Sequence, residues 1–173
     1  MKARILRFLH FFNKPIFKRI GITFIVFILL FFTFDFISPV DTKIKYSTIV
    51  ESKEGETMYA FLSEDDKWRL PIAISEISPD LKIAFLAKED KWFNYHPGVN
   101  PLAIIRAIFN NITKGKRTSG ASTITMQVAR LLKPAQRSYT NKLIEIFRAF
   151  QLELHYSKKR NFQNVFEFGA LWR

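Results

Sequence analysis

The sequence predicts a mainly α-helical chain with one transmembrane helix near its N-terminus, and three observations support this. Residues 20–37 are almost entirely apolar and form a run long enough for a helix to cross the hydrocarbon core of a bilayer. Pro79 and Pro101 each open a stretch in which apolar residues recur at helical spacing. The same spacing continues in residues 123–132 and 140–156.

The apolar run is preceded by basic residues and by no acidic one: Lys2, Arg4, Arg7, Lys14, Lys18 and Arg19. Because positive charge stays on the cytoplasmic side, we expect residues 1–19 in the cytoplasm, residues 20–37 in the membrane and the remainder outside the cytoplasm. The alternative, a buried core helix, is disfavoured by this one-sided charge. Bulky residues follow the run, whereas signal-peptide cleavage needs small ones, so an uncleaved single-pass anchor is expected.

The net charge of +12 implies an anionic partner, which can be nucleic acid, anionic lipid or a pyrophosphate-bearing substrate. Nucleic acid is disfavoured because the basic part of the chain lies outside the cytoplasm in the expected topology and has few aromatic residues for base stacking. The sequence has no cysteine, which excludes disulfides and thiolate sites.

Residues 38–75 are expected to form an extracytoplasmic stalk with short strands near 44–50 and 57–62. Ser78 is a suitable N-cap for a helix that runs to Glu89. In the helix from Pro101, the apolar residues share one side: Leu102, Ile105, Ile108, Phe109 and Ile112. In the last helix, which Thr140 would cap, the pattern predicts a buried stripe: Leu143, Phe147, Phe150 and Leu154.

Two motifs hold the polar residues that are candidates for chemistry. Residues 89–98 read EDKWFNYHPG, and residues 120–127 read GASTITMQ at a helix start. Backbone N–H groups at a helix start are a natural anion site, although Ser122 can equally be an ordinary N-cap. Between Asp90 and Glu145 the sequence has no acidic residue, but it has many basic ones: Lys91, Arg106, Lys114, Lys116, Arg117, Arg130, Lys133, Arg137 and Lys142. Carboxylates on both sides of a cationic interval suit base chemistry beside a phosphate-bearing substrate.

These motifs, with NKLIE at residues 141–145, resemble the family-51 peptidoglycan glycosyltransferases, the transferase module of bifunctional penicillin-binding proteins. The sequence of these motifs is most similar to that of the penicillin-binding protein 1C branch, and the match covers residues 68–158. The resemblance implies a lysozyme-like fold, with the N-terminal part of that domain in residues 76–159. It also implies lipid II as substrate, membrane lipid and other cell-wall synthesis proteins as partners, and a place in the bacterial inner membrane.

The resemblance assigns roles to single residues. Glu89 matches the catalytic glutamate, which would take the proton of a sugar hydroxyl as a general base. The first motif is completed by structural residues: Asp90, Phe93, His96 and Gly98. Among these, His96 is expected to brace the loop, and Gly98 to adopt a turn conformation closed to other residues.

The second and third motifs would bind the pyrophosphate of lipid II through polar and cationic side chains: Ser122, Thr123, Gln127, Arg130, Arg137 and Lys142. Glu145 would be a second catalytic residue that fixes these cations or a metal, and its alternative is an ordinary surface pair with Lys142. The resemblance also implies a divalent cation such as Mg²⁺ on the pyrophosphate, although the sequence shows no dedicated metal cluster.

The resemblance stops near residue 159. Residues 160–172 can be back-translated so that deletion of one adenine from the codons of residues 158–160 yields KKEIFKMYLNLAPYG, which is the missing family motif. We therefore predict a one-base insertion, an aberrant tail at residues 160–173, and a truncated chain that is poorly folded after the anchor and inactive as written. The alternatives to a glycosyltransferase are a lysozyme-like lytic glycosidase, which needs two nearby carboxylates, and a non-catalytic membrane-anchored fragment.

Overall fold

The computed structural model describes residues 15–115 and 120–168, and it divides the chain after Val40 into two units. The first unit contains helix α2, Pro15–Ile37, with a mean hydropathy of 2.5, which makes it long and apolar enough to cross a membrane. Most of the predicted basic segment 1–19 lies outside the described residues, as do Lys116 and Arg117 of the cationic interval. The predicted fold class, mainly helical with one N-terminal apolar helix, is confirmed.

The second unit begins with an antiparallel hairpin of β1, Ile49–Glu51, and β2, Thr57–Ala60, in which Val50 pairs with Tyr59. Both strands are shorter than the sequence suggests. The turn between them contains Gly55 with a φ of +84°, a left-handed conformation that glycine adopts without strain.

Helices α3, Pro79–Glu89, and α4, Pro101–Thr113, begin where the sequence predicts them. Ser78 caps α3 by accepting from the Leu81 N–H at 3.2 Å, and Asn100 caps α4 by accepting from the Ala103 N–H at 3.0 Å. Between these helices lies a short 3-10 helix, η1, Phe93–Tyr95.

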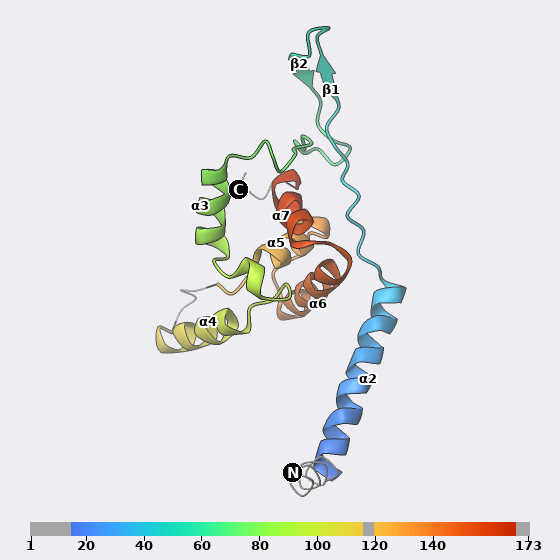
Figure 1. Ribbon diagram of the computed structural model, residues 1–173, viewed down its shortest axis with the longest axis vertical. Helices are drawn as coiled ribbons and strands as arrows, with labels where there is room; N and C mark the ends of the chain where they lie inside the picture. Colours follow the sequence, from blue (N-terminus) through green and yellow to red (C-terminus); the bar gives the residue numbers. More distant parts are fainter. Residues whose placement is uncertain (1–14, 116–119, 169–173) are drawn as a thin grey trace, which may run out of the picture. The chain divides into compact units, whose positions relative to one another are not determined.

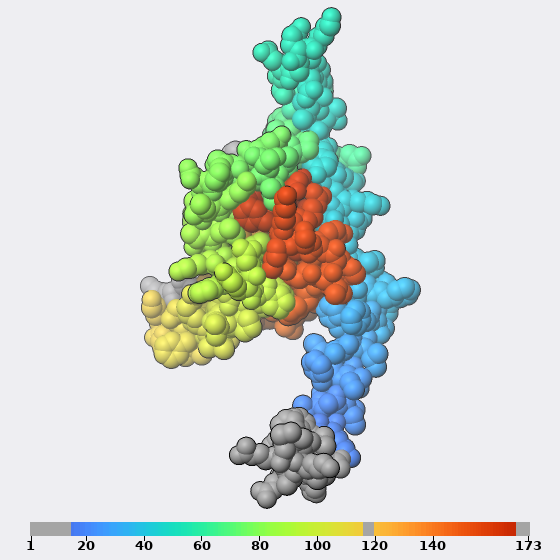
Figure 2. All heavy atoms as spheres, in the orientation of Figure 1, coloured from blue at the N-terminus to red at the C-terminus, as the bar shows by residue number. Residues whose placement is uncertain are grey.

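The core lies among α5, Ile124–Leu132, α6, Tyr139–His155, and α7, Lys158–Glu167, which contact one another (Figure 1). Its fully buried apolar side chains come from all three helices: Ile124, Met126, Val128, Leu152 and Val165. Helix α7 also packs beside α3 (Figure 2). The ring centroid of Phe85 lies 6.0 Å from that of Phe162 and 5.2 Å from that of Phe166.

The predicted buried stripe of α6 is wrong. Leu143 is 67% exposed and Leu154 is 51% exposed, whereas the buried face consists of Ala149, Gln151 and Leu152. The small side chain of Ala149 permits close approach of the chain at Gly98, whose position would bring an added Cβ within 2.7 Å of the Ala149 carbonyl oxygen. The apolar side chains of α4 are also exposed: Leu102, Ile105, Ile108, Phe109 and Ile112.

Helix α7 contains part of the segment for which the sequence predicts a frameshift. Its buried face is polar at Asn161 and Asn164, both 0% exposed. Within the described part of the chain, three side-chain atoms of these residues lack a hydrogen-bond partner: Nδ2 and Oδ1 of Asn164, and Oδ1 of Asn161. Buried amides without partners are costly, which makes these residues poor choices for a helix at this place. The frameshift itself stays a prediction, and residues 169–173 lie outside the described residues.

Candidate active site

Glu89 is the last residue of α3, and its carboxylate faces the first turns of α5. The Gln127 side-chain amide donates a hydrogen bond to Glu89 Oε2 at 2.9 Å. This contact joins the first motif to the second. Because the carboxylate also borders a cavity, it remains in reach of a substrate hydroxyl, as a general base requires.

Asp90 holds the two motifs together below this surface. Its side chain is 4% exposed and lies against that of His96, which is 6% exposed. His96 Nε2 is 3.0 Å from each Asp90 carboxylate oxygen, and the Ile124 N–H donates to Asp90 Oδ2 at 3.2 Å. A carboxylate at a helix N-terminus is favoured by the free N–H groups and the helix dipole. The structural roles expected for Asp90 and His96 therefore fit this geometry.

Thr123, and not Ser122, is the N-cap of α5. Its hydroxyl accepts from the Met126 N–H at 3.2 Å and donates to the Gly98 carbonyl oxygen at 2.5 Å. The residue is only 2% exposed. Since its hydroxyl is buried and already bonded on both sides, a direct contact between Thr123 and the substrate is disfavoured. Ser122, which is half-buried, is the more accessible hydroxyl.

Gly98 and Phe93 fix the shape of the first motif. Gly98 has a φ of +82° and sits directly against α6, so both its backbone conformation and its surroundings exclude a side chain. Phe93 is 3% exposed and serves as packing, as the sequence analysis expected.

Lys142 brings the third motif to the start of α5. Its ammonium donates to Ser122 Oγ at 2.6 Å and to Glu145 Oε2 at 2.8 Å. The Lys142 side chain is 35% exposed, whereas that of Glu145 is 17% exposed. The pair is therefore more than an ordinary surface ion pair, because Glu145 orients a cation that also contacts the second motif.

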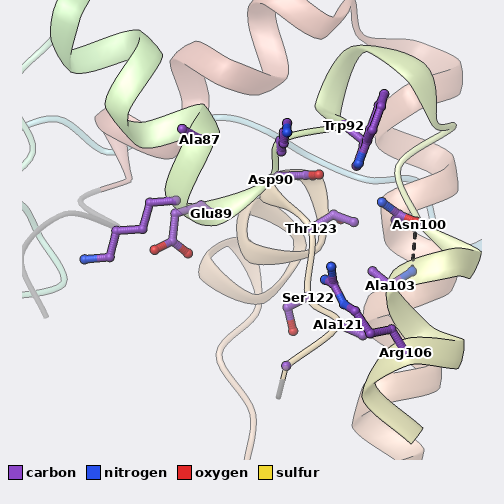
Figure 3. A pocket seen from close by; sticks show the side chains of 13 residues that line it. Ala87, Glu89, Asp90, Trp92, Asn100, Ala103, Arg106, Ala121, Ser122 and Thr123 are labelled. Atoms are coloured by element: carbon purple, nitrogen blue, oxygen red, sulfur yellow. Dashed lines mark hydrogen bonds between the residues drawn. The ribbon is translucent and has the colours of Figure 1, made fainter. Parts of the chain in front are cut away.

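The cavity at this place has a volume of about 280 Å³, and its wall includes Glu89, Ser122 and Arg106. Figure 3 shows these three side chains around the same hollow, with Arg106 contributed by α4. Arg106 was not among the site residues predicted from the sequence. Its position in the cationic interval was the only signal, and that signal does not separate it from its basic neighbours.

The two arginines that the sequence analysis selected lie elsewhere. Arg137 is exposed in the segment between α5 and α6, and Arg130 is half-buried in the last turn of α5. Neither forms an ion pair with Glu89 or Glu145 within residues 15–115 and 120–168. Their expected role in pyrophosphate binding stays a prediction.

The described residues include no group of three His, Cys, Asp or Glu side chains that could hold a metal ion. The carboxylates of Glu89 and Glu145 are each bonded to another side chain. These residues do not fit a dedicated metal centre, and the divalent cation that the resemblance implies stays a prediction.

The chain matches the family model described as transglycosylase over residues 54–170. It is 42% identical over 111 residues to penicillin-binding protein 1C of Escherichia coli (strain K12), covering 64% of this chain and 14% of that protein. It is 41% identical over 108 residues to the biosynthetic peptidoglycan transglycosylase of Janthinobacterium sp. (strain Marseille), covering 60% of this chain and 46% of that protein. Penicillin-binding protein 1A of E. coli is 35% identical over 115 residues, with 65% and 13% covered. The chain thus spans less than half the length of each of these relatives.

Proposed function

Because the chain belongs to the transglycosylase family, we propose that it provides the catalytic base and the pyrophosphate-binding residues of a peptidoglycan glycosyltransferase that polymerises lipid II. The observation that supports this most strongly is the convergence of three motifs at the start of α5. Gln127 bonds to Glu89, and Ser122 bonds to Lys142. A proton acceptor and an oriented cation thereby meet at one helix end.

In the proposed reaction, the 4-hydroxyl oxygen of the acceptor sugar attacks the anomeric carbon of the donor. Glu89 takes the hydroxyl proton as the new carbon–oxygen bond forms. The bond between the anomeric carbon and the lipid pyrophosphate breaks, and the pyrophosphate leaves with the bonding electron pair. Lys142 and Arg106 would neutralise its charge, since charged donors bind phosphate oxygens strongly.

A lytic glycosidase is disfavoured because Asp90, the carboxylate next to Glu89, is buried. A retaining glycosidase needs two carboxylates about 5 Å apart, and an inverting one needs a second carboxylate that activates water. Asp90 is adjacent to Glu89, but it is buried against His96 and bonded to the start of α5. It is therefore unavailable to a sugar or to a catalytic water.

The proposed location is the bacterial inner membrane, where α2 would anchor the domain beside its lipid-linked substrate. Helix α2 is long and apolar enough for this role. The basic residues before it favour a cytoplasmic N-terminus and an extracytoplasmic domain. The orientation is tested with a reporter enzyme that is active only outside the cytoplasm, fused after Arg173. We expect the fused reporter to be active, and an inactive reporter would contradict the proposed orientation.

The function is tested by offering the purified chain fluorescent lipid II and, separately, mature glycan strands without lipid. Binding of lipid II is followed by anisotropy, and products are separated on a gel. We expect this chain to bind the lipid-linked donor, the product of the gene with the predicted frame restored to convert that donor to strands, and both to leave mature glycan intact. Cleavage of mature glycan, or failure to bind lipid II, would contradict the proposal. Binding is measured independently so that it can be scored without turnover.

A further inference from the structure

Lys158, the first residue of α7, contacts the first motif at His96 and Phe93. Its ammonium donates to the His96 carbonyl oxygen at 2.6 Å and lies 4.5 Å from the centroid of the Phe93 ring. The same ammonium is 2.9 Å from Glu153 Oε2. An ammonium shared by a carbonyl, a carboxylate and an aromatic face is held in one place.

Glu153 extends this contact to α5. Its other carboxylate oxygen accepts from the Thr125 hydroxyl at 2.6 Å. Its Cγ lies 2.8 Å from the point where a Cβ on Gly98 would stand. The side chain is 11% exposed, and that of Lys158 is 27% exposed, so both charges are shielded from solvent and depend on each other.

The pair therefore contacts both segments that carry the proposed base and its partner. Lys158 fixes the loop that follows Glu89, and Glu153 fixes α5, which carries Gln127. We propose that Glu153 and Lys158 are positioning residues that set the Glu89 carboxylate against the Gln127 amide. The inference rests on the proposed function of Glu89, but the contact that it predicts can be measured without catalysis.

The pair can influence catalysis through distance alone. A general base must lie within hydrogen-bond reach of the proton that it takes, and a displacement of about 1 Å can lower a rate about 100-fold. Two of the three contacts of Lys158 act on the loop, at His96 and Phe93, a few residues from Glu89. Loss of these contacts would change the position of the Glu89 carboxylate, whereas Lys142, on the cationic side of the site, would stay in place.

The test uses the full chain in detergent with ¹⁵N-labelled glutamine, and the Gln127 side-chain resonance is assigned with Gln127→Glu. Three variants change the pair: Lys158→Met removes the charge, Glu153→Gln keeps the shape and the acceptor for Thr125, and Lys158→Arg keeps the charge. Lys159→Met is the matched control, since Lys159 is the exposed neighbour on the same helix. The Gln127 resonance reports the hydrogen bond to Glu89 directly.

We expect Lys158→Met and Glu153→Gln to move the Gln127 amide signal toward its position in Glu89→Ala, with Lys158→Arg and Lys159→Met close to the unaltered chain. In the product of the gene with the predicted frame restored, kcat for lipid II should fall about 10- to 100-fold in Lys158→Met and Glu153→Gln while KM changes less than about threefold. An unmoved Gln127 signal in both Lys158→Met and Glu153→Gln would overturn the inference. If Lys158→Met unfolds, the milder Glu153→Gln decides. A moved signal in a chain that never binds lipid II would refute the proposed function and leave the positioning role intact.

Discussion

Replacement of Asn164 by leucine should stabilise the protein. Asn164 is 0% exposed on α7, and both of its amide atoms lack a hydrogen-bond partner among the residues that the structure describes. A buried polar group without a partner costs about 1–3 kcal/mol relative to one that is satisfied. Leucine matches the branched shape of asparagine and has no polar atom to satisfy. The free energy of unfolding should therefore rise by about 1–3 kcal/mol for Asn164→Leu.

The change is measured by urea unfolding of the chain in detergent, followed by tryptophan fluorescence. Since the urea dependence of a small domain is about 1–3 kcal/mol per molar, the midpoint should rise by about 1 M. Asn94→Leu is the matched control, because Asn94 is exposed and the substitution there should change stability by less than about 0.5 kcal/mol. An unchanged or lowered midpoint for Asn164→Leu would refute the reasoning.

The same helix tests the predicted frameshift in a second way. The alternative frame reads isoleucine at position 161 and methionine at position 164, which are apolar residues at the two buried polar positions. Asn164→Met should be stabilising, because methionine adapts to irregular space. Asn161→Ile should gain less, because the Asn161 amide already donates to the Leu152 carbonyl oxygen at 3.2 Å. Destabilisation by both substitutions would argue that α7 is native as written.

Three further predictions follow from single contacts. Gly98→Ala should destabilise the chain by more than about 2 kcal/mol in urea unfolding, because a left-handed φ costs about 1–2 kcal/mol and an added Cβ would also collide with α6. Gly55→Ala has nearly the same φ but open space around it, so it should show only the cost of the left-handed φ. Equal effects of the two substitutions would contradict the predicted collision. Burial alone would raise the pKa of Asp65, but hydrogen bonds from neighbouring side chains hold this pKa well below its usual value of 3.8. The stability that this lowered pKa contributes is present above pH 3.8 and is lost as the pH falls below that value. A ¹³C titration in which the Asp65 carboxyl protonates at its ordinary pH would refute the assignment. Lys142→Met should weaken lipid II binding about 10- to 100-fold, since a charged hydrogen bond contributes about 1.5–3 kcal/mol. Lys159→Met should leave binding unchanged, because Lys159 is exposed on α7. Equal binding by both variants would show that Lys142 is not part of the binding site.

Local chemistry explains what could be predicted from the sequence. Ser78 followed by Pro79, and Asn100 followed by Pro101, start helices because a cap and a fixed φ need no distant partner. The left-handed Gly98 was predictable only through the family motif, since nothing local shows that its side lies against α6.

Tertiary contacts explain what could not be predicted. Periodicity shows that residues of α6 share a face, but it does not show which face another helix covers, and Leu143 and Leu154 are exposed for that reason. The sequence offers Ser122 as a possible cap of α5, but either hydroxyl fits the local pattern. The choice of Thr123 depends on the Gly98 carbonyl oxygen, which is 25 residues away in the sequence. The role of Arg106 at the cavity required the placement of α4.

The most direct test of the account is strand synthesis by Glu89→Gln in the product of the gene with the predicted frame restored, with lipid II binding measured in that product and in the present chain. Glutamine keeps the size of the side chain and can still face Gln127, but it cannot take a proton. We expect the rate of glycan formation from lipid II to fall about 10²- to 10⁴-fold with lipid II binding unchanged. Strand synthesis at the unaltered rate by Glu89→Gln would contradict the account.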